Sequence, residues 1–180
     1  MYEENDLMEM VKQGDHKAYE ELVSKYRKAG IAFAYQIIRD EYLAEDVVQD
    51  CFARIYILRE KYKNTYSFKT YLFALIKNRS IDYLRMQKAT VNIDDFELTP
   101  GSKNSIEQLV LEKEDIRQIY RQLEKIQGDY KQVLYLYAIE DLSYEQIAKV
   151  MKQTTAQVRV KIYRARQKLK LLRTEEGGIS

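Results

Sequence analysis

The strongest chemical signal in the sequence is a run of cationic side chains near its C-terminal end. Seven Lys and Arg residues follow one another there without an intervening acid, whereas an ordinary solvated helix mixes both signs. Such cations attract phosphate groups. The members of the run are Arg159, Lys161, Arg164, Arg166, Lys168, Lys170 and Arg173. The pattern favours nucleic-acid contact over the plain alternative, a helical hairpin with a solvated basic face.

The cationic run belongs to the second of two expected helices joined by a tight turn. The segments 143–146 and 154–157 are S/T-x-x-Q capping boxes, so helices are expected from about Tyr144 and Thr155. One apolar stripe of the second helix comprises Val158, Ile162, Ala165, Leu169 and Leu172. The opposite side presents Ala156, Val160, Tyr163 and Gln167, flanked by Arg159 and Arg164. This layout is typical of a DNA-reading helix-turn-helix.

A second group of residues, between positions 61 and 85, interleaves cations with aromatic rings. Cations attract phosphates, and aromatic faces stack on unpaired bases. The group comprises Lys61, Tyr62, Lys63, Tyr66, Phe68, Lys69, Tyr71, Phe73, Lys77, Arg79, Tyr83 and Arg85. We expect Phe73 and Tyr83 to be core residues. Tyr62, Lys63 and Tyr66 lie in a polar loop, so their side chains are expected to be exposed.

A third group is acidic and lies in the segment AEDVVQD. Asp46, Gln49 and Asp50 share one helical face by their spacing of three and four residues. Carboxylates on this face would repel duplex DNA, so the face is expected to be solvated or to meet a basic protein partner. It lacks the convergent ligands that a catalytic or metal site needs.

The composition argues against most enzyme chemistry. The single cysteine, Cys51, is expected to be a buried small hydrophobe, and the single histidine, His16, has no cysteine cluster around it. We therefore expect no metal, no cofactor, no small-molecule substrate and no catalytic activity. The acidic first residues differ from a signal peptide, so a cytoplasmic location is expected.

The elements that position these groups are expected to be helices, because 180 residues contain one proline and six glycines. Asp15 caps a helix that runs towards Ile38, and Arg39-Asp40 marks a break after it. Further helices run from about Tyr42 to Glu60 and from Phe68 to Arg85. The segment from Asp129 to Gln132 is a capping pattern that opens a helix with Val133, Leu134 and Tyr137. We predict an all-α fold of two small helical domains joined by a flexible linker, the second domain containing the helix-turn-helix. The expected boundaries are 1–88, linker 89–105, 106–173 and a disordered tail 174–180.

Four segments, in this order, resemble the extracytoplasmic-function sigma factors, which are promoter-recognition subunits of bacterial RNA polymerase. GDHKAYEELVSKY looks like the opening helix of that family, and AEDVVQDCFARIY looks like its polymerase-binding helix. SFKTYLFALIKNRSIDYLR looks like its −10 element segment. DLSYEQIAKVMKQTTAQVRVKIYRARQKL looks like its −35 element module.

The resemblance implies roles for particular residues and two macromolecular partners, core RNA polymerase and promoter DNA. Binding to the clamp helices of the largest polymerase subunit falls on Asp46, Gln49 and Asp50, and the flap region is a further implied contact. Recognition of the −10 element falls on Tyr62, Lys63, Asn64, Tyr66, Lys69, Tyr71, Lys77, Asn78 and Arg79. Recognition of the −35 element falls on Ala156, Arg159, Val160, Lys161, Tyr163 and Arg164. An anti-sigma factor, often membrane-bound in this family, is also implied.

The chain departs from the common family pattern at a few positions. Tyr71 stands where the family usually has tryptophan, which keeps a stacking face of smaller area. Val160 replaces a serine-like donor and would offer an apolar contact, such as one to a thymine methyl group. The usual Leu-Pro pair is replaced by Ile126-Gln127. We expect the fold to survive these changes and the promoter preference to differ.

Two other classes of protein compete with this interpretation. A helix-turn-helix repressor or activator would bind duplex DNA by itself, as a dimer on symmetric half-sites. The acidic face and the aromatic loop have no task in such a protein. A nuclease or helical hydrolase would need a catalytic constellation that the sequence does not offer.

Overall fold

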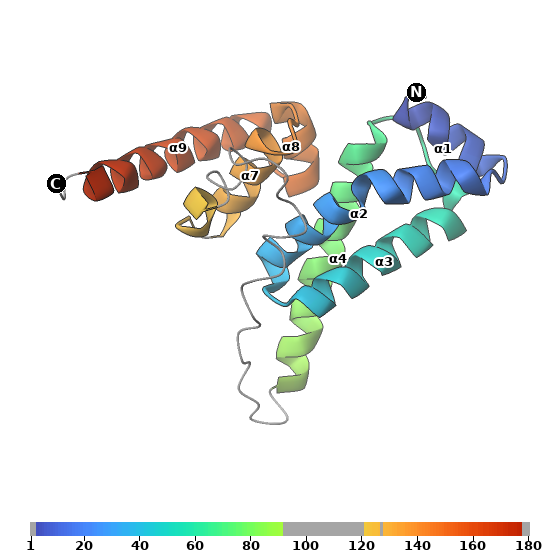
Figure 1. The fold of residues 1–180 in the computed structure, drawn as a ribbon, viewed down its shortest axis with the longest axis horizontal. Helices are drawn as coiled ribbons and strands as arrows, with labels where there is room; N and C mark the ends of the chain where they lie inside the picture. The colour runs from blue at the N-terminus through green and yellow to red at the C-terminus, as the bar shows by residue number, and fades with distance from the viewer. Residues whose placement is uncertain (1–2, 92–120, 127, 178–180) are drawn as a thin grey trace. The chain divides into compact units, whose positions relative to one another are not determined.

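The computed structural model describes residues 3–91, 121–126 and 128–177, and it divides the chain into two compact units (Figure 1). Unit 1 is Met1–Val110 and unit 2 is Leu111–Ser180. The described residues form helices and turns without a strand. The predicted all-α fold of two helical domains is confirmed. The predicted boundaries stay predictions, and linker residues 92–105 lie outside the described residues.

Unit 1 is a bundle built around one long central helix. Its helices are α1 (Glu4–Lys12), α2 (His16–Ile38), α3 (Glu41–Ile57) and α4 (Phe68–Val91), with a 3-10 turn at Arg59–Lys61. Helix α2 packs against α1, α3 and α4. The rings of Phe33 and Phe73 meet edge to face with centroids 5.2 Å apart, and both are fully buried. The core is therefore shared by α2 and α4.

Local signals explain where the helices of unit 1 begin and end. The Asp15 carboxylate accepts the backbone N–H groups of Lys17 and Ala18 at 2.8 and 3.2 Å, which confirms the predicted cap. Arg39 adopts a left-handed conformation with φ 64°, and the Asp40 carboxylate caps α3 through the N–H of Leu43. The predicted break at these two residues is confirmed.

Helices α1 and α4 differ from the sequence prediction. We did not predict α1, although Leu7, Met8 and Val11 lie at helical spacing and are buried. Helix α4 continues to Val91, six residues past its predicted end at Arg85 and beyond the predicted domain end at residue 88. The segment 68–91 contains neither glycine nor proline, so no residue type forces the helix to stop there.

Unit 2 contains α7 (Asp129–Ala138), α8 (Tyr144–Met151) and α9 (Thr155–Gly177), and α7 packs against the other two. The predicted helix with Val133 and Leu134 inward is confirmed as α7. Its predicted cap is wrong, because the N-cap is Gly128 with φ 64°, and Asp129 is already helical. Helix α9 reaches Gly177, three residues past the predicted start of the tail at residue 174, because its first glycine is Gly177 itself.

Candidate nucleic-acid interface

The two helices α8 and α9 begin at reciprocal capping boxes. The Ser143 N–H donates to the Gln146 side chain at 2.8 Å, and the Gln146 N–H donates back to the Ser143 hydroxyl at 3.2 Å. The same exchange joins Thr154 and Gln157 at 2.9 and 3.2 Å. Between the helices, Lys152 turns the chain with φ 54°. The predicted helix-turn-helix is therefore confirmed in its local chemistry.

Helix α9 separates a buried stripe from an exposed reading face, as its sequence predicts. Val158, Ile162 and Ala165 are buried. The exposed side carries Ala156, Arg159, Val160 (46% exposed), Tyr163 (64% exposed) and Arg164. A small residue, an apolar residue, an aromatic residue and two cations on one exposed helical face can reach base edges and phosphates in a major groove.

Lys161, one of the predicted −35 residues, forms an ion pair within unit 2. Its ammonium lies 2.7 Å from a carboxylate oxygen of Asp129, which also accepts the side-chain amide of Gln153 at 3.1 Å. Asp129 thus ties the start of α7 to the turn and to α9. The sequence predicted only a capping role for Asp129. Its contacts with Lys161 and Gln153 join residues far apart in the chain, so no local spacing indicates them.

Cations of α9 also lie over tyrosine rings of α7 and α8. The Arg159 guanidinium is 5.7 Å from the centre of the Tyr144 ring, and that of Arg166 is 4.8 Å from the Tyr137 ring. The two rings stack with centroids 5.5 Å apart. Such cation–π contacts hold long side chains in place at one edge of the reading face. In the sequence, two tyrosines (Tyr137 and Tyr144) and two arginines (Arg159 and Arg166) are each spaced seven residues apart. This matched spacing was the signal that could have predicted the two cation–π contacts.

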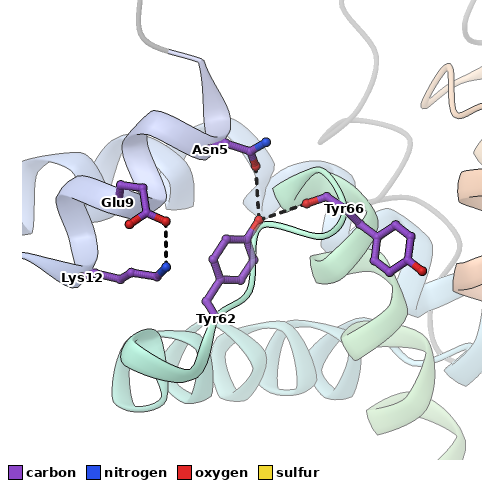
Figure 2. Close-up of polar contacts among 5 residues, drawn as sticks. All are labelled: Asn5, Glu9, Lys12, Tyr62 and Tyr66. Carbon is purple, nitrogen blue, oxygen red and sulfur yellow. Dashed lines mark hydrogen bonds and ion pairs between the residues drawn. The ribbon is translucent and has the colours of Figure 1, made fainter.

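Tyr62 corrects the prediction for the loop between α3 and α4. The residue was expected to be exposed, yet it is only 6% exposed. Its single hydroxyl proton is shared between two acceptors, the Asn5 side-chain oxygen at 3.2 Å and the Tyr66 carbonyl at 3.3 Å (Figure 2). Its ring packs against that of Tyr71 at 5.2 Å. Burial, with a smaller contribution from the nearby Glu4 carboxylate, raises the pKa of Tyr62 to about 12.

The exposed part of this loop is formed by Lys63, Asn64, Thr65 and Tyr66. Tyr66 is 43% exposed, and its ring points away from Tyr62 (Figure 2). The predicted exposure of Lys63 and Tyr66 is confirmed. The loop therefore exposes one aromatic face and one lysine, while Tyr62 holds the loop against α1.

The predicted −10 residues on α4 differ in how much surface they present. Lys69, Tyr71, Asn78 and Arg79 are half-buried, whereas Lys77 is buried at 9% exposure. Burial raises the pKa of Tyr71. Little of Lys77 therefore lies on the surface where the predicted DNA contact would form. Phe73 is core as predicted, and Tyr83 is half-buried.

The acidic face of α3 contains two exposed residues and one ion pair. Asp46 and Gln49 are exposed, and the Gln49 amide lies 3.5 Å from a Glu45 oxygen. Asp50 accepts the Nε–H of Arg79 at 2.8 Å and forms a second hydrogen bond with Nη2 of the same residue. Burial, followed by the Asp50 charge, raises the pKa of the adjacent Cys51 thiol to about 12, so Cys51 is an inert core residue as predicted.

The part of the chain that the structure describes offers neither a metal-ligand cluster nor a membrane-spanning helix. No cluster of three or more His, Cys, Asp or Glu residues is placed to hold a metal ion there. None of the helices in the described ranges combines the length and hydropathy that crossing a bilayer requires.

Comparison with known proteins agrees with the two units. Residues 22–90 match the family model of sigma-70 region 2, and residues 116–169 match that of sigma-70 region 4. The ECF RNA polymerase sigma-E factor of Haemophilus influenzae is 31% identical over 174 residues, covering 89% of this chain and 90% of the relative. The ECF sigma factor SigM of Bacillus subtilis is 28% identical over 153 residues, covering 85% and 93%.

Two solved structures share the fold. The sigma factor RpoE of Bartonella quintana, in complex with the anti-sigma factor NepR, superposes with a TM-score of 0.70 at 19% identity, covering 88% of this chain and 98% of RpoE. CnrH, in complex with the cytosolic domain of CnrY, gives 0.68 at 22% identity, covering 96% and 97%.

The two helical units and their matched regions define the sigma-70 class of transcription proteins. Within that class, the identity and coverage of the curated relatives are decisive. The chain belongs to the ECF RNA polymerase sigma factor family.

Proposed function

We propose that this chain directs promoter-specific initiation by core RNA polymerase and carries out no covalent step itself. In this role α3 docks on the polymerase through Asp46, Gln49 and Asp50. The loop 62–67 and α4 hold the −10 element, and α9 enters the major groove of the −35 element. The role places the protein in the cytoplasm, with polymerase. The observation that carries the proposal is the doubly capped helix-turn-helix, whose exposed face pairs cations with Val160 and Tyr163.

An anti-sigma factor is the proposed inhibitory partner. One of the two solved relatives is titled as a complex with the anti-sigma factor NepR, and the other as a complex with the cytosolic domain of CnrY. A protein that covers both the acidic face of α3 and the reading face of α9 would block both proposed contacts at once. The sign of charge on these two faces is opposite, so one such partner would need both an acidic and a basic surface.

Run-off transcription with purified core polymerase tests the proposed function. We expect transcripts from a cognate promoter only when the chain is added. Arg159→Ala should lower initiation, with a loss of ~1–3 kcal/mol in promoter binding if Arg159 reads a base. Tight, specific binding of duplex DNA by the chain without polymerase, together with no factor-dependent transcript, would favour the repressor interpretation instead.

A charge reversal tests the polymerase contact separately. Asp46→Lys changes an exposed carboxylate and should reduce co-purification with core polymerase while the fold is kept. Glu20→Lys makes the same change on an exposed position of α2 and serves as the control. Equal polymerase binding by both variants would remove α3 from the proposed interface.

A further inference from the structure

One ion pair joins the two surfaces of unit 1 that are proposed to serve different partners. Asp50 lies on the acidic face of α3, and Arg79 lies on the proposed −10 surface of α4. The Arg79 Nε–H donates to an Asp50 oxygen at 2.8 Å, and a second hydrogen bond runs from Nη2 to the same oxygen. The Asp50 and Arg79 side chains are 44% and 35% exposed, so both remain accessible. Each group is thus held by the other and reachable by a partner.

The surroundings of the pair single out Asp50 among the carboxylates of α3. Glu45 is engaged by Arg27 of α2. Asp46, one turn before Asp50, is exposed and forms no ion pair with the described residues. Arg54, one turn after Asp50, is exposed, and its charge and that of Arg79 both act on the Cys51 thiol beneath them. Asp50 is therefore the carboxylate that the α4 guanidinium engages.

Each partner competes with one member of this pair for the other member. A cationic protein surface that binds Asp50 competes with Arg79 for it, and a DNA phosphate that binds Arg79 competes with Asp50. Either partner therefore frees the group that the other requires. Thermodynamic linkage makes the effect reciprocal: each partner raises the affinity for the other by the same factor.

We propose that the Asp50–Arg79 ion pair couples polymerase binding to DNA binding in this chain. In the free protein the pair withholds Arg79 from phosphates, and docking on polymerase releases it. The proposal rests on the proposed function, because it takes polymerase and promoter DNA as the two partners. A partly exposed charge pair is expected to change each affinity by about two- to fivefold.

The first arm of the test uses the full chain without polymerase and a fluorescent single-stranded DNA oligonucleotide of mixed sequence at low ionic strength. Asp50→Asn should bind this DNA about two- to fivefold more tightly than the wild type. Asp46→Asn removes the same charge from the same helix without releasing an arginine, so its gain should be smaller. When Arg79→Ala is also present, Asp50→Asn and Asp46→Asn should increase the affinity for this DNA equally.

The second arm measures binding of core polymerase without DNA. Arg79→Ala should tighten this binding by a similar factor, because no ion pair of Asp50 with Arg79 then has to be broken before Asp50 binds polymerase. Lys88→Ala removes an equal charge from an exposed position on α4 and should leave the affinity unchanged.

Several outcomes would overturn the coupling. They are equal gains for Asp50→Asn and Asp46→Asn, weaker DNA binding by Asp50→Asn, or no tightening by Arg79→Ala. Failure of the wild-type chain to bind polymerase would instead refute the proposed function, and the first arm would still decide whether the pair withholds Arg79.

Discussion

Tyr62 and Tyr66 lie four residues apart, but burial gives them different tasks. Tyr62 is buried against Phe68 and Tyr71, and its hydroxyl is bound to Asn5 and to the Tyr66 carbonyl. A ring in that position cannot stack on a base without leaving the core. The Tyr66 ring is exposed instead, so base stacking in this loop is expected from Tyr66, and Tyr62 supports the backbone that carries it.

The buried phenol of Tyr62 predicts a loss of stability at alkaline pH. Its pKa is raised from 10.0 to about 12 on folding, so between these values the unfolded chain loses a proton that the folded chain retains. The free energy of unfolding must then fall as pH rises from about 10 to 12, by up to ~3 kcal/mol. In Tyr62→Phe, the part of this fall in the free energy of unfolding that comes from the Tyr62 phenol should be absent.

Urea denaturation at pH 8 and pH 11 measures the effect. Tyr62→Phe should be less stable than the wild type at pH 8 by about 1 kcal/mol, because the hydrogen bonding of the hydroxyl is lost, and the gap should narrow at pH 11. Tyr42→Phe removes a hydroxyl from an 83% exposed ring and controls for the loss of a tyrosine as such. A gap that widens with pH would contradict the assigned burial.

At the level of elements, the sequence predicted the helices whose ends carry chemical signals. Asp15, Ser143 and Thr154 accept the expected backbone N–H groups, and a helix follows each of them. Helix α1 went unpredicted because no side chain caps it. Contacts between distant residues, such as Asp129 with Lys161 and Asp50 with Arg79, were not predictable, because packing of helices rather than spacing creates them.

The close crossing of α2 with α3 and α4 predicts a steric requirement at Gly30. A Cβ atom there would lie 3.0 Å from Cδ1 of Ile76 and 3.3 Å from Cγ1 of Val48. Gly30→Val should therefore separate the helices and destabilise unit 1 by ~1–3 kcal/mol. Thermal or urea unfolding measures the change, with Ser24→Val at an exposed position of α2 as the control. Wild-type stability in Gly30→Val would show that the helices do not pack this closely.

At the scale of the whole molecule, the charge is divided between the two units. Residues 111–180 hold 14 Lys and Arg against 10 Asp and Glu, and residues 1–110 hold 16 against 18. The chain as a whole therefore carries only +2, with the excess of cations in the unit that contains α9. Because counterion release drives nonspecific DNA binding, the free chain should bind duplex DNA weakly and mainly through α9. Polymerase would then supply the affinity that the chain lacks alone.

This division of charge predicts a shallow salt dependence for duplex binding by the free chain. If about four phosphates are neutralised along α9, a plot of log K against log salt should have a slope near −4. Arg164 is exposed and forms no ion pair with the described residues, so Arg164→Ala should reduce the steepness by about one. Lys28→Ala, an equal charge change on an exposed position of unit 1, should leave the slope unchanged. A slope near −10, or equal effects of both variants, would mean that the chain binds duplex through a much larger surface, as a dimeric repressor does.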